Sequence, residues 1–273
     1  MKNIDLLKEV SRKLRIRILD MTYGAGKNGA HAGGGLSIVE ILAYLYFEGI
    51  MNYDVNNPED LNRDRFILSK GHAALALFGI LEQVGFLTKE DTDLFEVNGS
   101  PFYSHAKRNL SRGIEFSGGS LSLGLSYGVG VAISCRIDKL DNHIYVLVGD
   151  GECDEGLVWE SLMSAANFKL NNLTVIVDFN SMQSDGHSID IMDKTTLASK
   201  FQSFGFHVSE IDGHNLEEID VAFASRDFSK PNAIIAYTVK GKGVSFMENN
   251  INWHHGVLSK ELYESAVAEQ YRN

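Results

Sequence analysis

Residues 144–186 read IYVLVGDGECDEGLVWESLMSAANFKLNNLTVIVDFNSMQSDG, and this stretch decides the fold. An apolar run ends at Asp150, which stands between two glycines; a helical pattern follows, and a second apolar run ends at Asn180. Two almost entirely apolar runs joined by a helical pattern are typical of neighbouring strands in a parallel sheet that is covered on both faces. Ligands bind beyond the carboxyl ends of such strands, so Asp150 and Asn180 are the first candidates for a functional site.

The same alternation extends over the rest of the chain. Strand-like apolar runs occur at Arg65–Leu68, Ile144–Gly149, Leu173–Phe179, Phe206–Ile211 and Ala233–Val239. Helical spacing of apolar residues occurs at 4–21, 36–48, 73–84, 122–137, 156–169, 195–204 and 259–271. Because strands alternate with helices and no linker or repeat interrupts them, we expect an α/β fold: a mainly parallel sheet with helices on both faces, as one domain over residues 1–273.

The composition argues against several classes of protein. The 273 residues include 25 Lys and Arg against 36 Asp and Glu, a net charge of −11, which disfavours nucleic-acid binding because phosphate contacts need a basic surface. No apolar run approaches the ~20 residues that span a bilayer, so we expect no membrane segment. Cys135 and Cys153 cannot form a disulfide scaffold, and the first residues lack the pattern of a signal peptide. These features predict a cytoplasmic protein.

The turn at Asp150 contains an electrostatic conflict that a metal ion would resolve. The helix predicted to begin near Glu155 directs its amide groups and positive dipole end toward this turn, which suits an anion such as a diphosphate. The Asp150 carboxylate would repel that anion unless a cation lay between them. Mg²⁺ takes oxygen ligands and bridges protein groups to phosphates, so we predict that Asp150, Asn180 and a backbone carbonyl near Met182 bind Mg²⁺. Alternatively, Asp150 caps the helix and Asn180 fills a turn.

GDG at 149–151 followed by Asn at 180 resembles the shared cofactor motif of the thiamine diphosphate enzymes. Further segments resemble the N-terminal half of the transketolase family, in the same order along nearly the whole chain: AHAGGGLSIVEIL at 30–42, LSKGHAALALF at 68–78, SGGSLSLGLSYGVGVA at 117–132 and WHHG at 253–256. The resemblance implies the diphosphate-binding domain of the thiamine diphosphate-binding fold, with thiamine diphosphate and Mg²⁺ as cofactors.

The resemblance also implies roles for histidines in the matching segments. His72 and His255 are expected to contact the diphosphate or its surroundings, and His31 and His105 to face the substrate, all four as catalytic residues. His255 is chosen over His254 because a glycine directly follows it. An imidazole can donate hydrogen bonds to phosphate, or move a proton at a sugar hydroxyl, near neutral pH.

Cofactor contacts are implied for the backbone as well as for side chains. The segment around Gly119 and Leu121 is expected to line the aminopyrimidine ring. This chain has Ser104-His105-Ala106 where the family usually has Gly-His-Pro. The full set implied to bind the cofactor is His72, Gly119, Leu121, Asp150, Gly151, Glu152, Asn180, Met182 and His255.

A partner polypeptide follows from the same resemblance. In the family, a glutamate that hydrogen-bonds the aminopyrimidine ring belongs to the C-terminal half. We therefore expect one subunit of a two-polypeptide transketolase, assembled as α2β2, that acts on sugar phosphates with a C-terminal transketolase subunit. The alternatives are another thiamine diphosphate enzyme subunit, similar to deoxyxylulose phosphate synthase or to a 2-oxo acid dehydrogenase α subunit, and a non-catalytic cofactor-binding regulator.

Overall fold

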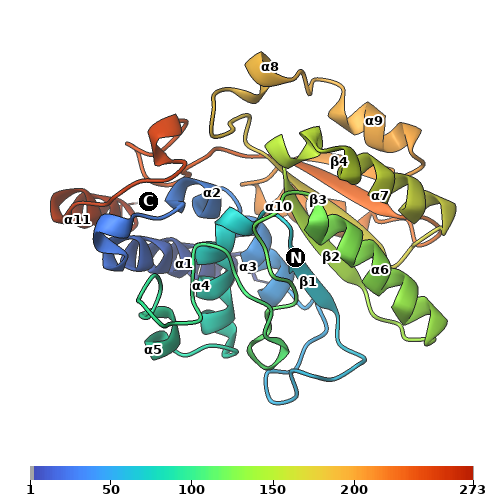
Figure 1. The fold of residues 1–273 in the computed structure, drawn as a ribbon, viewed down its shortest axis with the longest axis horizontal. Helices are drawn as coiled ribbons and strands as arrows, with labels where there is room; N and C mark the ends of the chain where they lie inside the picture. Colours follow the sequence, from blue (N-terminus) through green and yellow to red (C-terminus); the bar gives the residue numbers. More distant parts are fainter. Residues whose placement is uncertain (1–2, 273) are drawn as a thin grey trace.

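A computed structural model describes residues 3–272 of the chain. In this part of the chain, five parallel strands form one sheet in the order β1-β2-β3-β5-β4 (Figure 1). The strands are β1 (Arg65–Leu68), β2 (Ile144–Gly149), β3 (Leu173–Phe179), β4 (His207–Asp212) and β5 (Asn232–Tyr237). The predicted bounds of β1, β2 and β3 are confirmed, and those of β4 and β5 differ by one or two residues at their ends.

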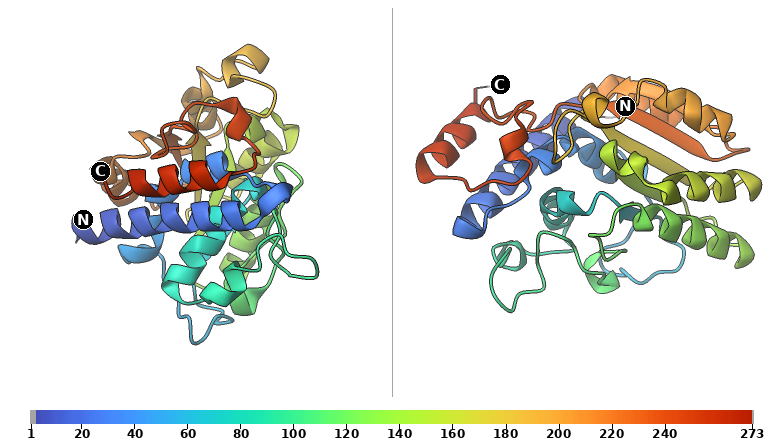
Figure 2. Two further views of the ribbon diagram at one scale, coloured as in Figure 1. Left: turned by 90° about the vertical axis from the view of Figure 1, so that its left-hand side faces the viewer. Right: turned by 45° about the horizontal axis from the view of Figure 1, so that its top comes forward.

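Helices cover both faces of the sheet, as the apolar strand residues require (Figures 1 and 2). Tyr145 and Leu147 of β2 belong to a core shared with α1 (Ile4–Gly24), α3 (Val39–Phe47), α4 (Ala74–Val84) and α10 (Leu216–Ala224). Val146 and Val148 point the other way, into a core shared with α6 (Leu123–Ile137), α7 (Gly156–Asn167) and α9 (Leu197–Ser203). The α/β fold with helices on both faces is as predicted.

One helical prediction differs from the structure, and three helices within residues 3–272 were not predicted, of which α10 is the longest. The pattern predicted over 36–48 is two helices, α2 (Ala32–Leu36) and α3, and the chain bends between them at Ser37. The Ser37 hydroxyl lies 3.0 Å from the carbonyl of Gly34 and 2.7 Å from the Asp178 carboxylate, so this residue is tied to a strand end. α10 was not predicted, although Asn215 caps its first turn by accepting hydrogen bonds from two backbone amides.

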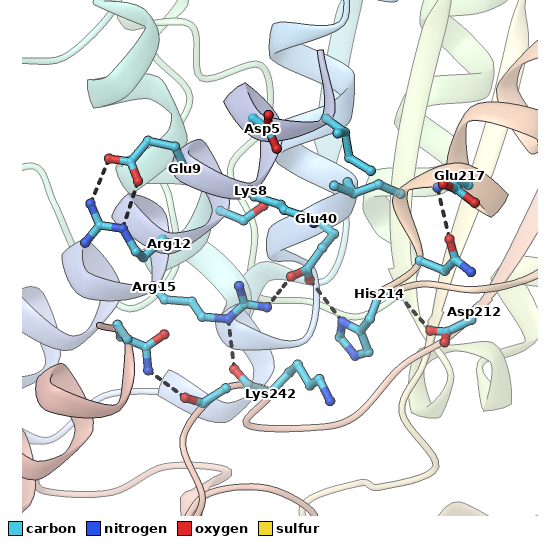
Figure 3. Close-up of a pocket in the computed structure, with 16 residues that line it drawn as sticks. Asp5, Lys8, Glu9, Arg12, Arg15, Glu40, Asp212, His214, Glu217 and Lys242 are labelled. Carbon is cyan, nitrogen blue, oxygen red and sulfur yellow. Dashed lines mark hydrogen bonds and ion pairs between the residues drawn. The ribbon is translucent and has the colours of Figure 1, made fainter. Parts of the chain in front are cut away.

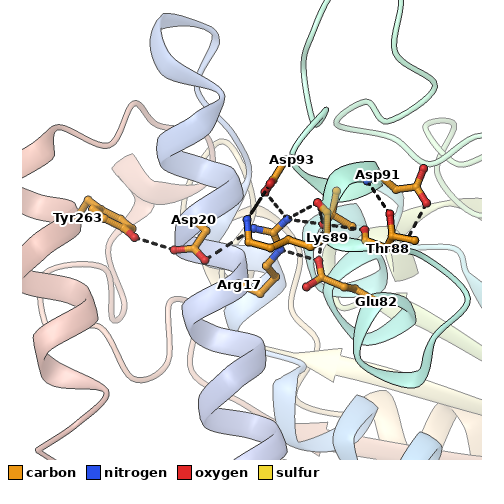
Figure 4. A network of polar contacts seen from close by, with 9 residues as sticks. Arg17, Asp20, Glu82, Thr88, Lys89, Asp91, Asp93 and Tyr263 are labelled. Carbon is orange, nitrogen blue, oxygen red and sulfur yellow. Dashed lines mark hydrogen bonds and ion pairs between the residues drawn. The ribbon is translucent and has the colours of Figure 1, made fainter.

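The remaining α-helices within residues 3–272 are α5 (Lys89–Thr92), α8 (Ser188–Ile191) and α11 (Lys260–Glu269), and five short 3₁₀ helices lie between the elements. A polar network joins α1 to α4, α5 and α11 (Figure 4). Arg17 is buried and its guanidinium contacts Glu82 and Asp93, each at 2.6 Å, while Tyr263 donates a 2.7 Å hydrogen bond to Asp20. No helix within residues 3–272 is long and apolar enough to cross a membrane.

Candidate functional site

The carboxyl ends of β1, β2, β3 and β5 meet at one edge of the sheet, and polar residues follow each of them. Lys70 comes after β1, Asp150 after β2, Asn180 after β3 and Lys240 after β5. The first three of these line a cavity of about 150 Å³, together with His72 and His254, among others. Because neighbouring parallel strands end side by side, residues far apart in the sequence share this cavity.

Asp150 and Asn180 lie at this cavity as predicted, and both are buried. Ser188 donates a 2.6 Å hydrogen bond to Asp150, whose pKa is raised by burial. The side-chain amide of Asn180 donates a 3.0 Å hydrogen bond to Asp178, and its oxygen accepts one of 3.1 Å from the Met182 amide. Since an ionised Asp178 can only accept, the Asn180 amide is oriented with its oxygen away from Asp178.

Glu152 also lines the cavity, but the protein itself satisfies its carboxylate. It accepts hydrogen bonds from the backbone amides of Ser122, at 2.7 Å, and Gly149, at 3.0 Å, and from the hydroxyl of Ser69. Burial raises the pKa of Glu152. Glu152 therefore fastens the GDG turn to the loops that follow β1 and precede α6.

A buried ion pair lies behind the cavity. Lys70 and Asp178 are 2% and 0% exposed and contact each other directly. Lys70 also donates a 2.8 Å hydrogen bond to the carbonyl of Gly34. Burial opposes ionisation of Asp178, but Lys70 outweighs it and lowers the pKa of that carboxyl. This pair places the Lys70 ammonium group in the cavity wall, with the Asp178 carboxylate as its counter-charge.

Five imidazoles form a cluster, of which His72 and His254 line the cavity. The ring of His31 lies between 4.6 and 5.8 Å, centre to centre, from four others, which are those of His72, His105, His254 and His255. Burial and the neighbouring histidines lower the pKa of His31 to about 3, and its buried Nδ1 has no hydrogen-bond partner among residues 3–272. Burial likewise lowers the pKa of His72, with Lys70 adding to the effect. His31 and His72 are therefore neutral at pH 7, and His31 keeps an unsatisfied ring nitrogen.

The structure places His254 and His255 differently. His254 lines the cavity, and its Nδ1 lies 2.8 Å from the ammonium group of Lys240. Burial, then Lys240, lowers the pKa of His254 to about 4, and burial, then Lys70, lowers that of Lys240 to about 8. His255 is exposed and packs against His31 instead. The choice of His255 for the diphosphate stays a prediction, with His254 the nearer to the cavity.

The glycine-rich segment before α6 approaches the loop after β1 closely. A Cβ on Gly71 would lie 2.6 Å from the amide nitrogen of Gly119, so glycine is required there. Leu121 lines the cavity and is 43% exposed, and a Cβ on Gly151 would lie 2.9 Å from Gln183. The structure thus gathers every predicted cofactor residue except His255 around or beside the cavity.

Sequence reasoning expected the segment SKGH at the ligand-binding edge but gave Lys70 no role, and it missed Lys240, although VKGKG also follows a predicted strand. It also missed a second cavity of about 820 Å³ (Figure 3). This large cleft is lined by α1, α3 and the loops after β4 and β5, and Arg15, Glu40 and His214 lie in its wall. These three pair with one another, so the cleft's buried charges are balanced.

Comparison with known proteins shows to which family the chain belongs. Residues 9–270 match the thiamine diphosphate binding domain of transketolase. The chain belongs to this family. It is 40% identical over 268 residues to one subunit of the apulose-4-phosphate transketolase of Phocaeicola vulgatus, an alignment that covers 97% of this chain and 94% of the relative. It is 42% identical to a 6-deoxy-6-sulfo-D-fructose transketolase subunit of Clostridium, covering 89% and 90%.

Full-length transketolases are matched over less than half of their length. Human transketolase is 34% identical, and the alignment covers 99% of this chain but 43% of that protein. The crystal structure of Campylobacter jejuni transketolase superposes with a TM-score of 0.91 at 30% identity, covering 98% of this chain and 43% of the other. The predicted resemblance to the transketolase N-terminal half, and the predicted fold, are confirmed.

Proposed function

We propose that this chain is the single-domain N-terminal subunit of a two-polypeptide transketolase. It binds Mg²⁺ and thiamine diphosphate and, with a C-terminal partner subunit, transfers a two-carbon ketol unit from a ketose phosphate to an aldose phosphate. The observation that carries the proposal is the meeting of Asp150 and Asn180 at adjacent strand ends, beside a buried lysine and a cluster of imidazoles. Relatives of nearly the same length that are named transketolase subunits support it.

The residues present fit the cofactor. Burial raises the pKa of Asp150, so a cation beside its carboxylate would be stabilising, and the Asn180 amide turns its oxygen away from Asp178; both groups suit a hard cation. Among residues 3–272 no three His, Cys, Asp or Glu side chains are grouped to hold a metal. The proposed site is of another kind, with one carboxylate, one amide and the carbonyl of Met182 supplemented by phosphate oxygens.

Positive and hydrogen-bonding groups face the space where the diphosphate would lie. His72, His254 and Lys70 line it, and the pKa values of both histidines are lowered by burial, so at neutral pH each can donate one hydrogen bond while neutral. Thiamine diphosphate, when bound, supplies the group that takes up the ketol unit. His31 and His105 lie beyond the cavity, where they can hold or move a proton at a sugar hydroxyl.

The small size of the cavity supports a shared active site. Complete small-molecule sites enclose roughly 300–1,000 Å³, whereas this cavity measures about 150 Å³. We infer that a partner subunit encloses the rest of the cofactor, in an α2β2 assembly. Both cysteines are buried free thiols, which agrees with a cytoplasmic enzyme.

Reconstitution tests this function. The chain is assayed for ketol transfer alone and mixed with its C-terminal partner, using sugar phosphates together with the two sugars named in the relatives, apulose 4-phosphate and 6-deoxy-6-sulfo-D-fructose. Activity is expected only from the mixture. Equal ketol transfer by the chain alone would refute the shared site, and pyruvate decarboxylation in place of ketol transfer would point to another thiamine diphosphate enzyme.

A further inference from the structure

The loop after β5 contacts residues of the large cleft and of the cavity at the strand ends, which we call the cofactor cavity. This loop carries Lys240 to the cavity side, where the lysine is 1% exposed. On the cleft side, the amide of Val239 donates a 2.8 Å hydrogen bond to Nε2 of His214 (Figure 3 labels the histidine). Nε of Arg15 donates a 3.1 Å hydrogen bond to the carbonyl of Lys242. Side chains that line the cleft therefore hydrogen-bond the backbone on both sides of Lys240.

His214 is itself fixed in position and in tautomer. Since its Nε2 accepts from Val239, the ring proton resides on Nδ1, which lies 3.0 Å from the Glu40 carboxylate and donates to it. Arg15 pairs with the other oxygen of Glu40. Burial opposes the charge on Glu40, but Arg15 and His214 together lower the pKa of its carboxyl. An ionised Glu40 therefore keeps the acceptor nitrogen of His214 directed at Val239.

A glycine brings this histidine close to the strand end. A Cβ on Gly213 would lie 2.5 Å from Cγ2 of Thr238, so another residue would force the loop after β4 away from the end of β5. The backbone amide of Gly213 also donates a 2.8 Å hydrogen bond to the carbonyl of Tyr237. The contact between His214 and Val239 is therefore built into the edge of the sheet.

On the cavity side, Lys240 fixes the tautomer of His254. The ammonium group can only donate, so Nδ1 of His254 accepts and the ring proton lies on Nε2. No hydrogen bond within residues 3–272 involves this Nε2, and His254 lines the cavity. An N–H group is thereby left for an acceptor such as a phosphate oxygen.

We propose that His214 is a positioning residue for the cofactor site: through the Val239 amide it holds Lys240 against His254, so that His254 presents its Nε2–H group to the cavity. His214 does not line that cavity, and Glu40 acts by fixing His214. The proposal deepens the proposed function and rests on it where the ligand is thiamine diphosphate.

Affinity for the cofactor gives the first test. The dissociation constant of thiamine diphosphate at saturating Mg²⁺ is measured on the assembled complex. His214→Ala removes the acceptor and should weaken binding about tenfold, whereas His214→Gln retains a carbonyl acceptor and should stay within about twofold. Glu217→Gln, a change in the same cleft, is the control and should leave affinity unchanged. Unchanged affinity in His214→Ala, or equal losses in the alanine and glutamine variants, would overturn the proposal.

A double-mutant cycle tests the route through Lys240. If His214 acts through Lys240, adding His214→Ala to Lys240→Met should cause no further loss of affinity. Losses that multiply would mean that His214 acts elsewhere and would overturn the proposal. His214→Leu, which fills the volume without offering an acceptor, replaces the alanine variant should that variant fail to fold.

NMR of the histidine ring nitrogens tests the positioning role of His214 independently of the proposed function. In the cofactor-free chain labelled with ¹⁵N-histidine, His254 should be the Nε2–H tautomer, and His214→Ala should shift its ring signals toward a mixture of tautomers. Unchanged signals would contradict the positioning role. An assembled wild-type complex that binds no thiamine diphosphate would refute the proposed function, and the tautomer would still decide the role of His214.

Discussion

The cofactor cavity and the large cleft both contain buried charged groups, but they differ in how these groups are paired. In the cleft, which measures about 820 Å³, Arg15, Glu40 and His214 satisfy one another. In the wall of the cavity of about 150 Å³, Lys70 is paired with Asp178. Lys240 and the imidazoles crowd together beside it, and burial and neighbouring groups lower the pKa values of Lys240, His254 and His31. Burial raises the pKa of Asp150. The proposed site is therefore the smaller of the two cavities.

Unfavourable electrostatics are the better guide to the site. Groups whose charged form is disfavoured gather at functional sites, whereas a structural ion pair, such as the one at Glu40, shifts the pKa toward the charged form. Substitutions in the two regions should therefore have different consequences, except at His214, whose hydrogen bond with Val239 links the cleft to the cavity. Changes in the cavity should reduce cofactor binding, and changes to the paired charges around α1 should reduce stability.

The largest effect is expected from Asp150→Ala. A ligand to Mg²⁺ should matter more than the groups behind it, whose loss costs roughly 10- to 100-fold in metal affinity, so the variant should lose at least about 100-fold in Mg²⁺-dependent binding of thiamine diphosphate. Isothermal titration calorimetry measures this. Asp5→Asn, a carboxylate change in the large cleft, is the control and should bind normally. Equal affinity of Asp150→Ala and wild type would contradict the metal assignment.

Removal of a paired charge on α1 should act on stability instead. Arg17→Ala removes a buried guanidinium from the partly exposed carboxylates of Glu82 and Asp93 and should lower the free energy of unfolding by roughly 1–3 kcal/mol in urea titrations. Arg12→Ala on the same helix removes an i,i+3 pair with Glu9 and should cost no more than about 1 kcal/mol. A loss of cofactor affinity in folded Arg17→Ala, without a loss of stability, would break the comparison.

The affinity for thiamine diphosphate should depend on pH because the charge of Lys240 does. The pKa of Lys240 in the free protein is about 8, and a bound diphosphate favours its charged form. Affinity should therefore be highest below pH 8 and fall by up to about tenfold per pH unit above it. Lys240→Met should bind more weakly and lack this decline. A wild-type profile that rises above pH 8 would contradict a cationic role for Lys240.

The smallest effect, a change in the free energy of unfolding, is expected from His31→Ala at neutral pH. The variant removes a buried Nδ1 that has no partner within residues 3–272, so the free energy of unfolding should change by no more than about 1 kcal/mol. As the pH falls from about 6.5 toward 3, the unfolded chain takes up a proton that folded His31 does not bind, so wild type loses stability that the variant retains. Denaturation at pH 7 and pH 5 tests this, and a variant that loses more stability than wild type between these pH values would contradict it. Ketol transfer by the complex should fall.

The sequence allowed the strand ends and the Asp150–Asn180 pair to be predicted because both depend on local patterns. Almost wholly apolar runs mark buried parallel strands, and the residues after them must lie at one edge of the sheet. α10 was missed although an Asn215 cap and apolar residues at Ile219, Ala222 and Phe223 mark it.

The rest depends on contacts between distant segments. The pairing of Lys70 with Asp178 and the hydrogen bond from Lys240 to His254 join residues from different parts of the chain, which no local pattern specifies. The same holds for His254 and His255, since two adjacent histidines can be told apart only by where the turn directs them. The contacts of Glu40 with Arg15 and His214 in the large cleft likewise join three separate elements.

A crystal structure of the chain with Mg²⁺, thiamine diphosphate and its partner subunit tests the central claim most directly. The account predicts a metal ion bound by the side chains of Asp150 and Asn180 and the carbonyl of Met182, with the diphosphate between that ion and His254. Cofactor density in the large cleft, or a diphosphate bound with no metal ion at Asp150, would contradict it.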